Sequence, residues 1–229
     1  MNQLEWDKAP DTLSELMQEK APIVLRGIPP VSVWTKEDVM ARDVYGTIPL
    51  FKEMTLVEWI RDAPPATPCP WSHVDAERIA ARSGLSVWAE KTLHTVFLPQ
   101  SVMRAWLHPQ YACWAGEVGL QRTFAMWTVI LPVDGSIQVT IMPETMDAYL
   151  PAPPFRQGCH PSRLTRRETP FVNELKFMDV IVRPGTGLIM PPHWFVSWTA
   201  HNVETLPLVC TVAYHSPVSR LAFRMAPFK

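Results

Sequence analysis

The hydrophobic pattern changes its period near residue 111, and this change constrains the fold more than any other feature of the sequence. In the first half, apolar residues such as Leu56, Trp59 and Ile60 recur at helical spacing. In the second half, residues 136–141 alternate polar and apolar side chains, as a half-buried strand does. Helices followed by strands are typical of an α+β domain whose strands form an antiparallel sandwich or barrel.

Capping residues predict where the helices of the first half begin. A Ser or Thr followed three residues later by an acidic residue can form a capping box, because each side chain accepts a hydrogen bond from the other residue's backbone. The expected elements are a strand at 21–27 ended by Gly27, helices that begin at Thr12, Thr35, Thr55 and Ser72, and a last helix over 100–107.

The second half reads as a series of short strands. Asp134-Gly135 is a turn signal, so residues 124–131 and 136–141 are expected to pair as an antiparallel hairpin. The further expected strands cover 178–182, 187–190, 194–200 and 206–215.

Length and composition indicate an ordinary globular protein, with one sizeable domain or two small ones. The chain has 229 residues, 47% of them hydrophobic and 19% charged, which is enough for a packed core. The formal net charge of -1 gives no global attraction for a polyanion. The start of the chain lacks the basic and apolar segments of a secretory signal and is too acidic for a typical transit peptide, and no apolar stretch reaches the length of a membrane span. We therefore expect an intracellular protein.

The four cysteines, Cys69, Cys113, Cys159 and Cys210, are far apart in the sequence and form no CxxC pair. A cysteine zinc site is therefore not expected. The prediction is that the thiols are reduced.

A basic segment at 156–169 carries Arg156, Arg163, Arg166 and Arg167 with a single glutamate. It predicts a long exposed loop between barrel strands. The simplest interpretation is a solvated loop, because short charge clusters usually are solvated. The alternatives are contact with an acidic protein partner or with the phosphates of a nucleic acid, of which nucleic acid is not favoured. The proline-rich loop at 63–70 and the basic, apolar tail at 218–229 are the other expected contact segments.

Several segments, taken in order, resemble the JmjC and cupin-like family of Fe(II) and 2-oxoglutarate hydroxylases. The best match is RPGTGLIMPPHWFVSW at 183–198, and the others are PIVLRG at 22–27, FKEMTLVEWI at 51–60, FLPQSVMRAW at 97–106, WAGEVG at 114–119 and LPVDGSIQVTIMPE at 131–144. The resemblance covers about 22–215 and implies a double-stranded β-helix, or jelly-roll barrel, preceded by packed helices.

Active members of this family hold iron through a His-x-Asp/Glu pair and a distant histidine, which leave other positions open for cosubstrate and oxygen. The resemblance places the pair at Ala125 and Trp127, or at Arg122 and Phe124, and the distant histidine at Val196. The lysine or arginine that would bind 2-oxoglutarate falls at Ile137, and an acidic residue of the family falls at Thr186. Because none of these side chains matches, no catalytic, cofactor or metal residue and no cofactor is predicted.

Three histidine patterns have structural interpretations. His73-Val-Asp75 is a literal His-x-Asp, but it lies where Ser72 and Asp75 suit helix capping. His193 is expected to be a packing or surface residue. His201 and His215 flank the last strand and could approach each other.

The predicted architecture is a single domain over 1–229, with a helical part at 1–110, barrel strands at 111–217 and a tail at 218–229. The predicted function is that of a non-catalytic relative which acts as a subunit of a larger protein assembly. Two alternatives remain: an active dioxygenase with a displaced metal site that uses His73 and Asp75, or a small-molecule-binding cupin with a dry aromatic pocket.

Overall fold

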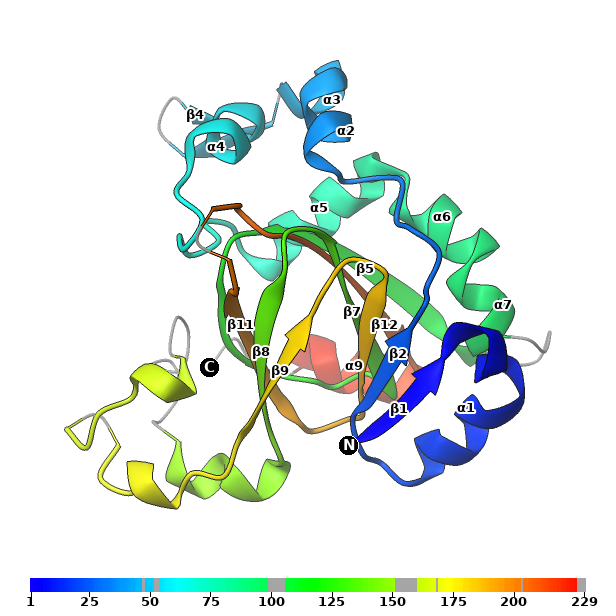
Figure 1. The fold of residues 1–229 in the computed structure, drawn as a ribbon, viewed down its shortest axis with the longest axis vertical. Coiled ribbons are helices and arrows are strands. Elements are labelled where there is room, and N and C mark those ends of the chain that lie inside the picture. Colours follow the sequence, from blue (N-terminus) through cyan, green and yellow to red (C-terminus); the bar gives the residue numbers. More distant parts are fainter. Residues whose placement is uncertain are drawn as a thin grey trace.

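The computed structural model describes residues 1–46, 48–51, 54–98, 106–150, 160–167, 169–202 and 204–225. Its centre is a barrel of two sheets, with helices packed along one side and an insert projecting from the other (Figure 1). The barrel strands are β5 (His108–Ala115), β6 (Val118–Arg122), β7 (Trp127–Asp134), β8 (Ile137–Met142), β9 (Met178–Val182), β10 (Thr186–Met190), β11 (Phe195–Ala200) and β12 (Leu208–His215).

The strand order is that of a double-stranded β-helix. The larger sheet has the order β1-β2-β10-β7-β12-β5, and the smaller sheet has the order β6-β11-β8-β9. Successive strands from β5 to β12 therefore change sheet at every step except β8 to β9. This topology confirms the predicted α+β jelly-roll fold. The larger sheet is extended by β2 (Ile23–Arg26) and by β1 (Asn2–Glu5), which pairs with β2 in parallel.

The predicted hairpin of residues 124–131 with 136–141 is wrong. The first of these strands begins only at Trp127, and it pairs with β10 and β12, whereas β8 pairs with β11 and β9. Gly135, with φ of +70°, makes the expected turn. That turn carries the chain from one sheet to the other, because consecutive strands of this fold belong to opposite walls of the barrel.

The capping residues locate three helices correctly. Thr35 and Ser72 each accept a backbone hydrogen bond at the start of a helix, and both Thr55 and Ser72 form complete capping boxes. The helices are α1 (Ala9–Gln18), α2 (Lys36–Ala41), α3 (Asp43–Gly46), α4 (Leu56–Asp62), α5 (His73–Ser83), α6 (Leu85–Lys91), α7 (Leu93–Phe97) and α9 (Pro217–Met225), and a small pair of strands, β3 (Pro49–Phe51) and β4 (Met54–Thr55), lies before α4.

One expectation about the helices is wrong. The first helix does not begin at Thr12 but at Ala9, because Pro10 suits the first turn and the Thr12 hydroxyl donates to the carbonyl of Lys8. In the segment expected as a basic, apolar tail, Pro217–Met225 forms helix α9. The helix expected over 100–107 lies mostly outside the described residues.

The proline-rich loop at 63–70 is docked on the turn between β5 and β6. The Glu117 amide donates to the carbonyl of Thr67 at 2.8 Å, and the Cys69 amide donates to the carbonyl of Glu117 at 2.7 Å. Gly116 has φ of +96°, and a Cβ atom there would lie 2.3 Å from the carbonyl oxygen of Thr67. The close contact therefore requires glycine, and part of this loop is not free to meet a partner.

The segment that follows β8 packs against the outer face of the smaller sheet. It contains the short helices η2 (Glu144–Tyr149), η3 (Pro161–Arg163) and η4 (Val172–Glu174), and we call the described part of 144–177 the insert. It buries a second hydrophobic cluster, formed by Leu120, Met142, Met146, Leu150, Leu175 and Phe195. The insert is thus partly a packed element and not only an exposed loop. Among the described residues, no helix is long and apolar enough to cross a membrane.

Candidate functional site

The interior of the barrel is where the resemblance places its metal ligands. Alternate residues of β11 face opposite sides: Val196 and Trp198 belong to the main core, whereas Phe195 belongs to the cluster under the insert. Val196 is 2% exposed and pairs with Ile141 of β8 and Gln121 of β6. The position of the distant histidine therefore holds an isopropyl group inside the core.

Both registers for the His-x-Asp pair lead to side chains with other roles. Ala125 is 1% exposed and adds only a methyl group, and Trp127 packs partly buried against the core. Arg122 lies on the outer face, where it forms ion pairs with Glu144 and Asp147 and its guanidinium lies over the rings of Phe124 and Phe195. None of these groups can coordinate Fe(II) from the barrel interior.

The positions that the resemblance assigns to the cosubstrate cation and to the acidic residue also hold uncharged side chains. Ile137 is fully buried at the start of β8, and Thr186 pairs with Arg26 at the start of β10. A dicarboxylate that entered this part of the barrel would meet an apolar wall and no charge partner at Ile137.

Two buried tryptophans from opposite sheets meet inside the barrel. The ring centroids of Trp114 and Trp198 lie 6.0 Å apart, and their planes meet at 82°. Trp198 is fully buried, and the Trp114 indole donates to the Thr211 hydroxyl at 3.2 Å. These indoles fill space between the two sheets.

The literal His-x-Asp motif forms helix-start contacts. The Asp75 carboxylate accepts from the amide and the hydroxyl of Ser72. The His73 Nε2 atom lies 3.1 Å from the Glu77 carboxylate, and its ring packs on Trp114. Asp75 therefore caps the start of helix α5, as predicted, and His73 pairs with Glu77 on the same helix. The described residues contain no group of three His, Cys, Asp or Glu side chains that could hold a metal ion.

A polar cluster lies where the first and last barrel strands meet helix α5. The Glu77 carboxylate accepts from the Gln110 amide at 3.2 Å in addition to its contact with His73. His215 is 2% exposed, and burial together with the positive charges of His73 and Arg220 lowers its pKa to about 4. The His215 ring is consequently neutral at physiological pH.

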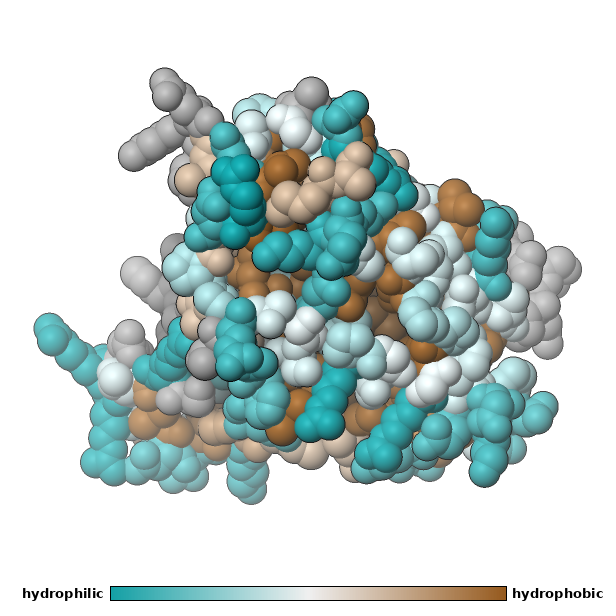
Figure 2. Space-filling model, turned by 45° about the horizontal axis from the view of Figure 1, so that its top comes forward, coloured by the Kyte–Doolittle hydropathy of each residue, from teal (hydrophilic) through white to brown (hydrophobic). Residues whose placement is uncertain are grey.

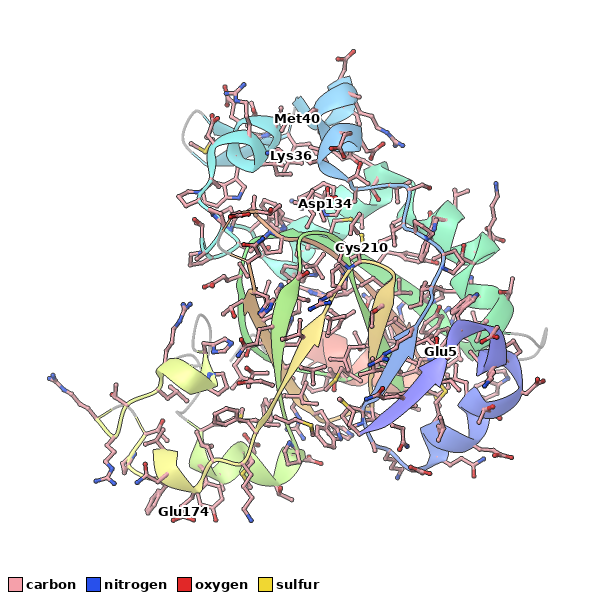
Figure 3. The ribbon with its side chains drawn as sticks, in the orientation of Figure 1. Glu5, Lys36, Met40, Asp134, Glu174 and Cys210 are labelled. Carbon is pink, nitrogen blue, oxygen red and sulfur yellow. The ribbon has the colours of Figure 1, made fainter. Side chains whose placement is uncertain are left out.

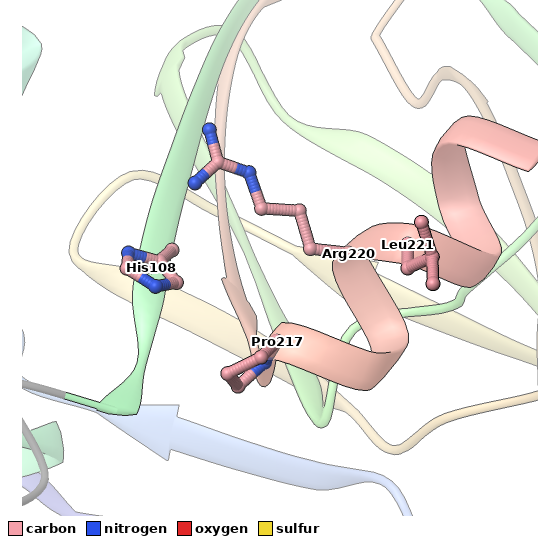
Figure 4. Close-up of a pocket in the computed structure, with 4 residues that line it drawn as sticks. All are labelled: His108, Pro217, Arg220 and Leu221. Carbon is pink, nitrogen blue, oxygen red and sulfur yellow. The ribbon is translucent and has the colours of Figure 1, made fainter.

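A cavity of about 310 Å³ opens beside this cluster, between the start of β5 and helix α9. His108, Pro217, Arg220 and Leu221 line it (Figure 4). Arg220 extends from α9 toward the strands, and its Nε atom is buried without a hydrogen-bond partner among the described residues. The sequence did not single out this arrangement, although the spacing of His73 and Glu77 by four residues could have indicated a paired face of α5.

The remaining histidines do not form a common site. His193 is exposed in a turn, in agreement with the expectation of a surface residue. His201 and His215 do not approach each other: the amide of His201 bonds the carbonyl of Ser136 near the start of β12, and His215 ends that strand. The two residues therefore lie at opposite ends of β12.

The basic residues of the insert divide into two groups. Arg163 forms a bidentate ion pair with Glu117, at 3.0 and 3.2 Å, and Glu117 is 7% exposed. Arg166 and Arg167 are exposed, and no ion pair to either is present among the described residues. Arg156 and Cys159 lie outside the described residues.

Comparison with known proteins gives little further information. No family model and no curated protein matches the sequence. Among solved structures, hydroquinone 1,2-dioxygenase from Sphingomonas sp. TTNP3 with 4-hydroxybenzoate bound aligns at TM-score 0.32 and 18% identity, over 49% of this chain and 62% of its own. E. coli ycfD aligns at TM-score 0.36 and 15% identity, over 58% of this chain and 31% of its own. The chain thus spans 62% and 31% of these two proteins, and at such low scores the assignment of the jelly roll rests on its own strand order.

Proposed function

We propose that this chain is a non-catalytic jelly-roll protein that serves as an interaction subunit of a protein assembly. The observation that carries the proposal is the buried, apolar character of the interior position Val196, where the distant iron ligand would stand. Ala125, at a position of the paired iron ligands, and Ile137, at the position of the cosubstrate cation, are likewise buried and apolar.

The packing of the barrel interior supports the same view. A pocket that had lost its iron and cosubstrate would leave a costly cavity unless other side chains filled it. Trp114 and Trp198 lie in that interior, 4% and 0% exposed. The fold is thus maintained by a hydrophobic core where active relatives keep an open site, and it is available as a scaffold for other surfaces.

The insert provides a surface that suits an acidic protein partner. Arg166 and Arg167 are exposed, and the same insert carries two exposed large apolar side chains, Phe171 at 61% and Phe177 at 42%. The insert forms the projecting corner at the lower left of Figure 1, and hydrophilic and hydrophobic side chains lie next to each other on that corner in Figure 2. Arginine and aromatic side chains are enriched at the centres of protein interfaces.

Nucleic acid is the less favoured partner of this surface. Of the basic residues described in the insert, Arg163 is already paired with Glu117, which leaves Arg166, Arg167 and Lys176. Nucleic-acid affinity depends on the neutralisation of several phosphates, and the formal net charge of this chain is -1. A partner with a few carboxylates and an apolar patch fits the insert better.

The experiment is a measurement of affinity for the protein that co-purifies with the chain from its source. The double substitution Arg166→Glu and Arg167→Glu is expected to weaken that affinity by roughly tenfold, which is about 1.4 kcal/mol. The matched control is Arg82→Glu, an exposed position on α5 outside the insert, which should leave the affinity unchanged. A chain that elutes alone from native extract, or a double variant that binds as tightly as the wild type, would contradict the proposal.

The cavity at Arg220 favours a second candidate function, the binding of a small organic carboxylate. Arg220 presents a permanent positive charge to an open space of about 310 Å³, which among the described residues is also lined by His108, Pro217 and Leu221. Calorimetry with acetate, benzoate and succinate tests this candidate, and Arg220→Gln should abolish any heat of binding. Absence of binding to the wild-type protein at millimolar concentrations would eliminate it.

A further inference from the structure

Two of the cysteines, distant in sequence, lie directly opposite each other in the larger sheet. Cys113 of β5 and Cys210 of β12 are partners in the antiparallel register, and their Sγ atoms are 3.9 Å apart. Both residues are fully buried. Cys210, which is labelled in Figure 3, belongs to β12.

The backbone at this pair already has the spacing of a disulfide. Residues directly opposite each other on antiparallel strands have Cα atoms about 4.5–5.5 Å apart. Disulfides span Cα separations of about 4.4–6.8 Å. Closing the gap between the sulfur atoms therefore needs side-chain rotation and little movement of the strands.

We propose that Cys113 and Cys210 are a modification site, at which a peroxide oxidant forms a cross-strand disulfide. The bond joins the first barrel strand, β5, to the last, β12. This inference goes beyond the proposed interaction function and does not depend on it.

The chemistry takes two steps. In the first, the thiolate of one cysteine attacks hydrogen peroxide, the O–O bond breaks, and a sulfenic acid and hydroxide form. In the second, the thiol of the other cysteine displaces the sulfenic hydroxyl group as water, and the S–S bond forms. The two thiols together lose two electrons and two protons, and one peroxide is reduced to two molecules of water.

The position of the pair makes this reaction slow and dependent on local opening. Burial raises the pKa of the Cys210 thiol well above its usual range, so little thiolate is present. The Cys113 sulfur also contacts the Ser83 hydroxyl at 3.8 Å, at the end of helix α5. Because β5 lies at one edge of the larger sheet, its transient separation from the neighbouring elements would admit a small oxidant.

The disulfide should stabilise the native state substantially. It closes a chain segment of 97 residues and so restricts the unfolded chain over nearly half of its length. We expect the melting temperature to rise by roughly 5–15 °C after oxidation and to return on reduction with dithiothreitol.

The test is oxidation of the full-length, folded wild-type protein with hydrogen peroxide, followed by peptide mapping without reduction. The expected product is a peptide pair linked through Cys113 and Cys210, with an intact mass lower by two hydrogen atoms. Cys69→Ser, a change outside the pair, should give the same linked product, and Cys113→Ser should abolish both the linkage and the gain in melting temperature.

The mapping of the wild-type protein decides the result even where a variant folds poorly. Linkage through Cys69 or Cys159 overturns the proposal. So does oxidation of Cys113 and Cys210 to separate sulfinic acids, or the persistence of two free thiols after every other cysteine has reacted.

Discussion

The indoles of Trp114 and Trp198 meet edge to face inside the barrel, with centroids 6.0 Å apart and planes at 82°. Trp114 comes from the first barrel strand and Trp198 from the seventh, so the contact joins the larger and the smaller sheet. Edge-to-face pairs of this kind add to the stabilisation that burial alone provides. In this protein the space between the sheets is therefore part of the core.

Removal of the Trp198 indole should lower the stability of the fold. Trp198→Ala is expected to lower the free energy of unfolding by about 3–5 kcal/mol, because it deletes a fully buried side chain and leaves a cavity. Urea unfolding measures the change. The control Trp106→Ala, at a position 64% exposed, should cost little. If the two variants were equally stable, the interior around Trp198 would not be packed as described.

The contact between Gly116 and Thr67 predicts an intolerance to any side chain. Gly116→Ala places a Cβ atom 2.3 Å from a carbonyl oxygen on a backbone with φ of +96°. We expect a loss of about 2–4 kcal/mol in stability. Gly46→Ala is the matched control, since its Cβ would meet nothing within 4 Å and helix α3 favours alanine. A neutral Gly116→Ala would mean that the proline-rich loop is not docked on the β5–β6 turn.

His215 should make stability depend on pH. Its pKa is about 4 in the folded protein and about 6.5 in the unfolded chain, so the unfolded chain takes up the proton first as the pH falls. The free energy of unfolding should therefore decrease as the pH falls from about 6.5 toward 4, by a few kcal/mol in total. Burial lowers the pKa of His215 most, and His73 and Arg220 lower it further, whereas the Glu77 carboxylate raises it.

The check is a series of urea titrations between neutral pH and about pH 5. The variant His215→Gln cannot titrate, and its stability should fall less steeply than that of the wild type over this interval. Burial and the charge of Arg163 also lower the pKa of His160, so a smaller slope should remain in the variant. Identical slopes for both proteins would contradict the assignment to His215.

The ion pair of Glu117 with Arg163 should hold the insert against the barrel. Glu117→Gln removes the charge partner of a bidentate contact at a nearly buried site. We expect trypsin to cut after Arg166 and Arg167 several times faster in this variant. Asp62→Asn breaks an exposed pair with Arg61 outside the insert and should leave the rate of cutting unchanged. Equal rates for both variants would show that the ion pair does not position the insert.

Much of the fold could be predicted because the signals were local. The capping boxes at Thr55 and Ser72 depend on residues three apart, and strand 178–182 was bounded correctly by its own composition. The hairpin prediction failed because the Asp134-Gly135 signal predicts a reversal of the chain but does not predict the sheet to which the next strand belongs. That choice is made by long-range pairing.

The candidate site was predictable only in part. The interior position of Val196 followed from the resemblance, whereas the cluster of Glu77, Gln110, His215 and Arg220 combines α5, β5, β12 and α9, which only the fold brings together. The same holds for Cys113 and Cys210, which are 97 residues apart and touch across two strands. The Lys36 amide likewise donates to the carboxylate of Asp134, 98 residues away in the sequence; both residues are among those labelled in Figure 3.

The lack of a cosubstrate cation at Ile137 predicts the behaviour of the protein with 2-oxoglutarate. A dicarboxylate inside the barrel would lose its hydration without gaining a charge partner at that position. Succinate production in the presence of Fe(II) and ascorbate should not exceed that of a heat-treated control. Turnover that depends on added iron would contradict this prediction.

The central claim is that the barrel has no iron centre, and the stoichiometry of bound iron tests it most directly. The protein is reconstituted with excess Fe(II) under anaerobic conditions, desalted, and analysed for metal by mass spectrometry. The account predicts far less than one iron per chain and no change on His73→Ala. One tightly bound iron per chain that is lost on His73→Ala would contradict it and would establish the displaced site in its place.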